Sequence, residues 1–208
     1  MTPFANYAHA ETAASPIESA KRAPVAPELF GTIALQIAAS RFGEDWKRAC
    51  RESMSPRMRN LTRPAANVTR EQQIAYVQKA VTRLIGWRSD TTQWGRHDYW
   101  ASADETLSRG LGDGEDRAIV KMQALRVLGF SSRDLFLTLG RDRVAGPQAI
   151  LIVRLRNRYL VLDANGSTPF TPDKRPEFTP ALTFAYGATW VHVGNSMRAP
   201  IVALNSQR

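Results

Sequence analysis

The sequence is poor in cysteine and histidine and has no long apolar run. Cys50 is the single cysteine among 208 residues, which excludes an internal disulfide and a Cys-rich zinc site, and three histidines are too few to predict a His-based metal site. No stretch reaches the ~18 consecutive apolar residues of a membrane-spanning helix. Residues 1–25 also lack the apolar core of ~7–15 residues found in secretory signals. As written, we expect a soluble chain without an export signal.

The overall composition is that of one folded domain. Hydrophobic residues make up 43% and charged residues 23% of the chain, close to globular averages. The net charge is +9, and most of the basic residues are arginine. Such a balance favours anionic partners or serves solubility alone.

The first half of the chain predicts a leader followed by helices. Residues 1–27 mix Pro, Ala and Ser without periodicity, which predicts a flexible leader, and we expect 28–208 to form a single domain. Within 28–54, apolar residues recur at helical intervals and predict two short helices. Thr69 and Gln72 then form a capping box ahead of a strong amphipathic helix.

The second half predicts a central helix and a sheet. Ser102 and Glu105 form another capping box, and the short helix that follows should end at Gly110. A clear amphipathic helix is expected from Asp113 until Gly129 stops it. After that the hydrophobic period changes from 3.6 to 2. Strands are predicted at 135–139, 149–155 and 159–162, with a turn at 156–158, and residues 181–193 suggest further strand or aromatic packing. This order favours an α+β fold with the central helix packed on an antiparallel sheet.

Several motifs, in a fixed order, resemble a known family. They are Asp98-Tyr99-Trp100-Ala101-Ser102 with Glu105, Gly112-Asp113-Gly114-Glu115-Asp116, Leu125-x-x-Leu128-Gly129, Gly146-Pro147-Gln148-Ala149, and Leu160-Val161-Leu162-Asp163. Together they resemble the bacterial transglutaminase-like cysteine proteases, the LapG-like periplasmic group that acts on biofilm adhesins. The resemblance spans about Phe30 to Trp190 and implies a papain-like fold.

This resemblance also implies that the catalytic triad is degenerate here. In the family, a nucleophilic Cys stands between the Asp and Glu of the acidic motif, where a helix N-terminus lowers the pKa of the thiol. Gly114 occupies that position, Gln148 is the most natural match for the catalytic His, and only the third member, Asp163, remains. Since Gly has no nucleophile and Gln accepts no proton near neutral pH, we expect an inactive relative, a pseudoenzyme.

A residual hydrolase with a different nucleophile is an alternative. Cys50 follows Trp46 on a predicted amphipathic helix, where a small buried hydrophobe is the simpler interpretation. Thr106 and Ser108 lie near the motif in sequence, but neither His97 nor His192 falls at the position that the family uses for its base.

Acidic residues flank the missing Cys and remain intact. In LapG-like members such residues are associated with calcium, whose preferred ligands are carboxylate oxygens, so the resemblance implies a calcium site at Asp113, Glu115 and Asp116. The alternative is an N-cap with an acidic first turn, which stabilises any helix by ~0.3–1 kcal/mol without a metal.

The resemblance further implies a cleft that can bind a polypeptide without cutting it. We expect Trp94, Trp100 and His192 to lie at this cleft, although ordinary core packing would also account for the two tryptophans. The implied partner is a protein or peptide, such as a LapG-type substrate or regulator. The implied location is the periplasm, which the chain as written does not itself show; removal of an export signal would reconcile the two expectations.

A second class of function rests on charge. Arginines gather around two predicted strand ends, and alternate residues of a strand share a face, so they predict a basic patch for an anionic polymer such as nucleic acid or acidic polysaccharide. The patch would comprise Arg141, Arg143, Arg154, Arg156 and Arg158. Nucleic acid is disfavoured because the aromatic residues do not interleave with these arginines. A sheet edge protected by charge explains them equally simply.

Overall fold

A computed structural model describes residues 27, 29–51 and 54–194 of the chain. The predicted leader, apart from Pro27, lies outside the described residues. Among the residues described, no helix combines the length and the apolar character that a membrane crossing requires.

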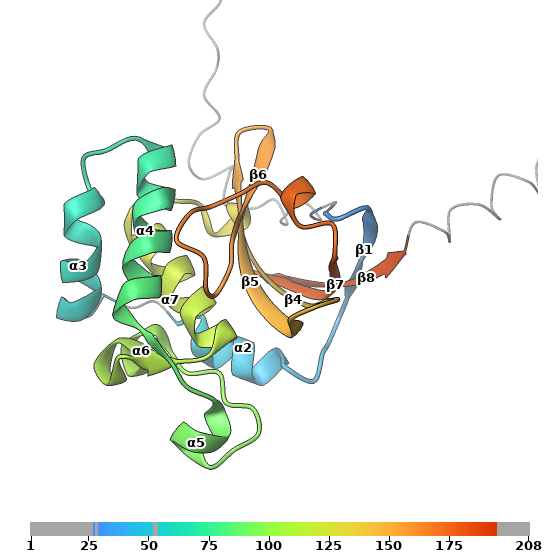
Figure 1. Cartoon of the computed structure of the whole chain (residues 1–208), viewed down its shortest axis with the longest axis horizontal. Helices are drawn as coiled ribbons and strands as arrows, with labels where there is room; N and C mark the ends of the chain where they lie inside the picture. The colour runs from blue at the N-terminus through green and yellow to red at the C-terminus, as the bar shows by residue number, and fades with distance from the viewer. Residues whose placement is uncertain (1–26, 28, 52–53, 195–208) are drawn as a thin grey trace, which may run out of the picture.

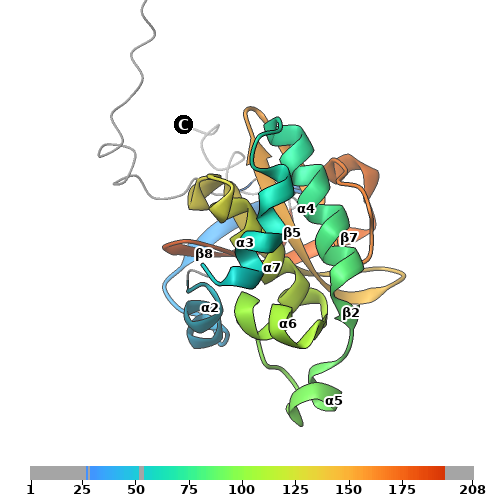
Figure 2. The ribbon, with the colours of Figure 1, turned by 90° about the vertical axis from the view of Figure 1, so that its left-hand side faces the viewer.

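The helices form one side of the molecule (Figures 1 and 2). Both predicted capping boxes are present, because the side chains of Thr69 and Gln72, and those of Ser102 and Glu105, bond each other's backbone amides. Gly110 ends its helix in the left-handed conformation, at φ 66°. The α-helices are α2 (Gly43–Ala49), α3 (Pro56–Thr62), α4 (Arg70–Leu84), α5 (Asp90–Trp94), α6 (Ala103–Arg109) and α7 (Gly114–Val127).

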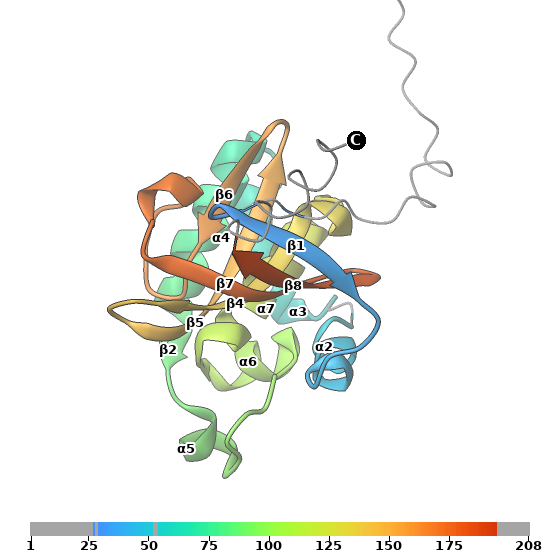
Figure 3. The ribbon, with the colours of Figure 1, turned by 90° about the vertical axis from the view of Figure 1, so that its right-hand side faces the viewer.

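A six-stranded antiparallel sheet forms the other side (Figure 3). Its strands are β1 (Thr32–Ile37), β4 (Leu135–Asp142), β5 (Gly146–Leu155), β6 (Arg158–Leu162), β7 (Phe178–Ala185) and β8 (Ala188–Gly194), in the order β1-β8-β7-β4-β5-β6. A short parallel pair, β2 (Gly86–Trp87) and β3 (Leu111–Gly112), joins the segments that precede α5 and α7. The predicted α+β architecture is confirmed.

The sheet separates two apolar clusters. Alternate residues of β5 point to opposite faces: Leu151 and Val153 pack with the helices, whereas Ile150 and Ile152 pack on the far side with Trp190. α7 lies between the sheet and the other helices and is buried around most of its circumference, so the prediction that this helix is clearly amphipathic is wrong. Even its charged residues Arg117 and Lys121 are buried.

The first of the two helices predicted within 28–54 is wrong. Residues Thr32–Ile37 form β1, which pairs antiparallel with β8 from Thr32 opposite Gly194 to Ile37 opposite Thr189. The apolar residues at 33 and 37 fit a helical spacing of four and a strand spacing of two equally well, and the pairing partner lies far along the chain. The second predicted helix is present as α2.

Candidate functional site

A cleft of about 1270 Å³ opens at the N-terminus of α7. It lies between that helix end, the β4–β5 hairpin, the start of β7 and the loop ahead of α6. Gly114, at the first turn of α7, and Ala149, on β5, both line it. The cleft therefore forms where the resemblance places a catalytic centre.

Gly114 and Ala149 face each other across the base of this cleft. A Cβ atom on Gly114 would lie 3.5 Å from the Cβ of Ala149, an ordinary van der Waals contact. Gln148, predicted to match the catalytic His, also lines the cleft, but strand alternation places it on the opposite face of β5 from Ala149, and its side-chain amide donates to the Pro147 carbonyl at 2.9 Å. The structure thus places Ala149 rather than Gln148 against Gly114, a difference of one residue in register.

Asp163, the third predicted triad member, follows β6 and stabilises a loop. Its Oδ1 accepts the backbone N–H of Gly166 at 2.5 Å, and its Oδ2 lies 3.5 Å from the guanidinium of Arg175. The buried ammonium of Lys121 donates to the Asp163 carbonyl. These contacts show how Asp163 and the adjoining loop are held against α7.

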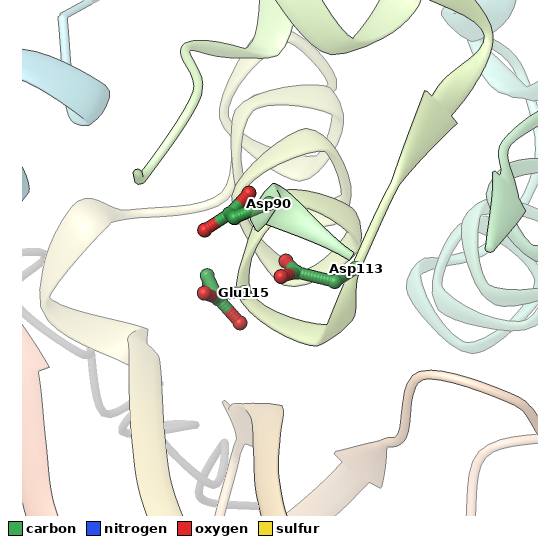
Figure 4. Close-up of side chains that lie close together, drawn as sticks. All are labelled: Asp90, Asp113 and Glu115. Carbon is green, nitrogen blue, oxygen red and sulfur yellow. The ribbon is translucent and has the colours of Figure 1, made fainter. Parts of the chain in front are cut away.

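Asp90, Asp113 and Glu115 bring their carboxylates together beside the first turn of α7 (Figure 4). One oxygen of each lies within 4.8 Å of the others. Asp90 is 2% exposed and accepts the Tyr99 N–H through one oxygen. Its Oδ1 and the Oδ1 of Asp113 are buried and bond nothing among the described residues. We call these three residues the acidic trio.

Asp116, predicted to share a site with Asp113 and Glu115, does not join the acidic trio. It is fully buried and accepts the backbone N–H of Ala101 at 2.9 Å, which fixes the loop ahead of α6. Asp90 takes its place because β2 pairs with β3, so the segments that enter α5 and α7 run side by side. No local motif marks Asp90, and only this pairing reveals it.

Burial and mutual repulsion disfavour the charged forms of these carboxylates. Burial, with the nearby charge of Asp90, raises the pKa of Asp113 to about 6. Burial, with the charge of Asp113, raises the pKa of Asp116 to about 8. The pKa values of Asp90 and Glu115 are raised as well, chiefly by burial. A cation among the acidic trio would offset this repulsion.

Tryptophans line the cleft in a different pattern from the predicted one. Trp100 contributes to the lining but is 1% exposed. Its ring stacks on that of Phe42 with 5.3 Å between the ring centroids, so Trp100 also belongs to the core. Trp94 is not among the lining residues and packs against Tyr99 and under the Arg109 guanidinium. Trp87, which the sequence analysis missed, lines the cleft and is 62% exposed.

His192 lies on the face of the sheet opposite α7 and is not among the cleft-lining residues. It shares that face with Trp190, two residues earlier on β8. Its Nδ1 is 2.8 Å from the Thr32 hydroxyl, and its Nε2 is 2.8 Å from the Thr183 hydroxyl. Because Thr32 donates to the Leu29 carbonyl, we assign the proton to Nδ1, which leaves Nε2 to accept from Thr183.

We predict that His192 makes the protein less stable in acid. Burial lowers the pKa of this imidazole from 6.5 to about 4, so the unfolded chain takes up its proton first. The contribution of His192 is present in full above pH 6.5 and is lost as the pH falls from 6.5 towards 4. Urea unfolding of wild type and His192→Gln at pH 7 and pH 4.5 measures it: the two proteins should differ less at the lower pH. His97→Gln is the control because His97 is exposed. If the stability difference from wild type changes with pH equally in His97→Gln and His192→Gln, the assignment is wrong.

The alternative nucleophiles lie outside the cleft. Cys50 is 5% exposed, and burial raises the pKa of its thiol far above the ordinary value. Thr106 is fully buried and donates its hydroxyl to the Ser102 carbonyl at 3.1 Å, while Ser108 is exposed on α6. Among the described residues that line the cleft, Thr179 carries the one aliphatic hydroxyl and His97 the one imidazole.

The five arginines of the predicted basic patch do not form one patch. Arg141 and Arg143 line the cleft near the start of β5, whereas the other three lie around its far end. There, Arg154 pairs with Asp134 at 2.7 Å and Arg158 approaches Glu71 at 3.5 Å. Arg156 occupies the turn with φ 57°, so it does not continue the strand face of Arg154 as the alternation rule assumed.

Comparison with known proteins bears on the fold and the family. The model of the bacterial transglutaminase-like cysteine proteinases (BTLCP) matches residues 32–178. Legionella pneumophila LapG superposes with a TM-score of 0.58 at 24% identity, over 68% of this chain and 79% of that chain. Its calcium-bound structure gives a TM-score of 0.58 at 23% identity, over 72% and 86%. An EGTA-treated structure gives 0.57 at 22% identity, over 68% and 81%. No curated protein matches.

Proposed function

Since the chain belongs to the bacterial transglutaminase-like cysteine proteinase family, we propose that it is an inactive member that holds a polypeptide segment in its cleft without cleaving it. One observation carries this proposal: Gly114 and Ala149 face each other where the family chemistry needs a thiol and an imidazole. Neither side chain can attack a carbonyl or accept a proton, so the covalent route of a cysteine protease lacks both of its reacting groups.

The cleft itself supports polypeptide binding. Trp87 offers an exposed aromatic surface, and Ala145, just before β5, adds small apolar surface together with Pro147 and Ala149 on that strand. Charged groups of both signs, including Arg141 and Glu177, also line it and can bond a peptide backbone. A site of this size with mixed apolar and polar lining suits an extended segment of several residues.

We further propose that the acidic trio holds a calcium ion. The donor set fits, because calcium prefers carboxylate oxygens and two oxygens of the trio are buried without a partner among the described residues. The ion would supply positive charge that neutralises the trio and fixes the first turn of α7. In this role Asp90 and Asp113 position the cleft wall rather than act on a substrate.

The proposed partner is a periplasmic polypeptide, in keeping with the LapG-like relatives. Candidates are a LapG-type substrate segment, which this protein would shield, and a regulator for which it would compete. The anionic-polymer alternative has less support because the arginines that suggested it lie at two separate places.

Peptide binding in the cleft predicts a dependence on Trp87. An array of immobilised peptides, probed with wild type and with Trp87→Ala in calcium, should contain a subset that the variant binds at least about tenfold more weakly. The substitution should leave folding intact because the side chain is largely exposed. Tyr186→Ala, which removes an aromatic ring that is 48% exposed at the β7–β8 turn, is the matched control. An array on which both variants bind every peptide as wild type does would contradict the proposal.

A further inference from the structure

The outer face of the α3–α4 hairpin carries an unusual concentration of positive charge. Residues 56–84, from the start of α3 to the end of α4, contain six Lys and Arg but one Asp or Glu, a net charge of +5 out of +9 for the chain. All six basic side chains are exposed. This helical layer faces the viewer in Figure 2. The cleft described above is a separate feature, which opens at the N-terminus of α7.

An apolar groove of about 610 Å³ lies within this basic face, between α3 and α4. Leu61, Tyr76 and Ala80 form its inner part, and Tyr76 and Ala80 pack directly on the core. Leu84 lines it as well and remains 52% exposed. A half-exposed leucine beside an apolar groove indicates a surface where a partner can bury further apolar area.

Two cations, Lys79 and Arg83, complete the lining of this groove. Both side chains are exposed, and neither pairs with a carboxylate in the part of the chain that the structure describes. They lie four residues apart on α4, so their side chains occupy the same face one turn apart. The groove therefore combines an apolar base with a positively charged rim.

We propose that this groove binds an amphipathic helix of a partner protein, whose apolar residues enter the groove and whose acidic residues meet Lys79 and Arg83. The lining extends from Tyr76 to Leu84, about 12 Å at 1.5 Å per residue, which suits roughly two turns of a helix. In the partner helix, apolar residues at i and i+4 would fill the apolar base of the groove, and neighbouring Asp or Glu would meet its positively charged rim.

The charge and the shape favour this occupant over others. A second copy of the chain would bring two faces of like charge together, which is unfavourable. A lipid surface would need apolar side chains that protrude into the bilayer, whereas this apolar surface is concave. Nucleic acid has no aliphatic anchors to fill the groove. The inference does not rest on the function proposed for the cleft.

The test is a displayed library of helical peptides selected on the wild-type protein. The retained peptides should carry two apolar residues four apart with acidic neighbours. Binding should weaken at least about tenfold for Lys79→Glu/Arg83→Glu and for Leu84→Asp. The matched control is Arg57→Glu/Arg63→Glu, which changes the net charge equally at exposed positions outside the groove lining.

Three results would overturn the proposal. One is a selection in which no retained peptide binds wild type more tightly than it binds the groove variants. Another is an equal loss of binding in the Arg57/Arg63 control, which would mean attraction by charge alone. The third is binding of phosphatidylglycerol vesicles that depends on Leu84 while no peptide competes, which would assign the surface to a membrane. Circular dichroism of each variant confirms that the fold is retained.

Discussion

Calcium is expected to raise the unfolding temperature of this protein, and Asp113→Asn is expected to abolish that rise. A ligand that binds only the folded state stabilises it by RT ln(1 + [L]/Kd), about 2.7 kcal/mol at a concentration of 100 Kd. For a chain of this size that corresponds to a shift of roughly 5–10 °C. Thermal unfolding with millimolar calcium, and with EGTA, measures it directly.

Without calcium, the same substitution should act in the opposite direction. Burial and the neighbouring carboxylates raise the pKa of Asp113 from 3.8 to about 6, so its ionisation at neutral pH opposes folding. Below about pH 4 Asp113 is neutral in both the folded and the unfolded protein, and its carboxyl does not oppose folding. The stability of wild type therefore falls as the pH rises from about 4 through 6. Asp113→Asn should therefore be more stable than wild type in EGTA at pH 7, by on the order of 1–3 kcal/mol, and gain little at pH 4.

Asp116→Asn is the matched control for the calcium site. Asp116 accepts the Ala101 N–H, and burial raises its pKa to about 8, so the neutral form predominates at pH 7 and Asn closely replaces it. This variant should keep the calcium shift, whereas Asp90→Asn should lose it. A calcium shift that survives in Asp90→Asn and Asp113→Asn but disappears in Asp116→Asn would contradict the assignment of ligands.

The second large effect concerns Gly114 and Ala149. Gly114→Cys combined with Ala149→His is expected to create peptide hydrolysis, since it returns a thiol to the N-terminus of α7 and an imidazole to the facing strand. The Cβ of residue 114 fits without a clash, 3.5 Å from that of residue 149. Mass spectrometry of a complex peptide mixture should detect new chain termini, with the rate limited because Asp163 is engaged by Gly166 and Arg175.

The control for this variant is Gly114→Cys with Gln148→His. Residue 148 also lines the cleft, but strand alternation places it on the other face of β5, so its imidazole should lie too far from the thiol to activate it and hydrolysis should not appear. Activity in the Gln148→His combination but not in the Ala149→His combination would show that the register across the cleft is misassigned. Cleavage by both combinations would show that the choice between residues 148 and 149 does not decide the activity.

Local sequence signals predicted much of this architecture. The capping boxes at Thr69 and Ser102 and the stop at Gly110 depend on neighbouring residues, and all three are confirmed. The β-branched and aliphatic runs after Gly129 located most of the sheet, because β4 and β5 are buried on both faces and such strands are apolar along their length. The acidic motif placed the start of α7 within one residue.

Features that depend on distant pairing were not predictable from the sequence. Thr32–Ile37 is a strand because β8 lies beside it, and a single-strand pattern does not reveal that partner. Asp90 joins Asp113 because β2 and β3 run in parallel. The choice between Gln148 and Ala149 depends on which face of β5 meets α7, and a shift of one residue reverses that face.

We propose that this protein has a protease-like cleft without protease chemistry. The most direct test incubates the wild-type chain with calcium and a proteome-derived peptide mixture, and counts new termini by mass spectrometry. We expect no cleavage above a protein-free sample, alongside clear cleavage by the Gly114→Cys/Ala149→His variant. Cleavage by wild type that disappears in Cys50→Ala would contradict it.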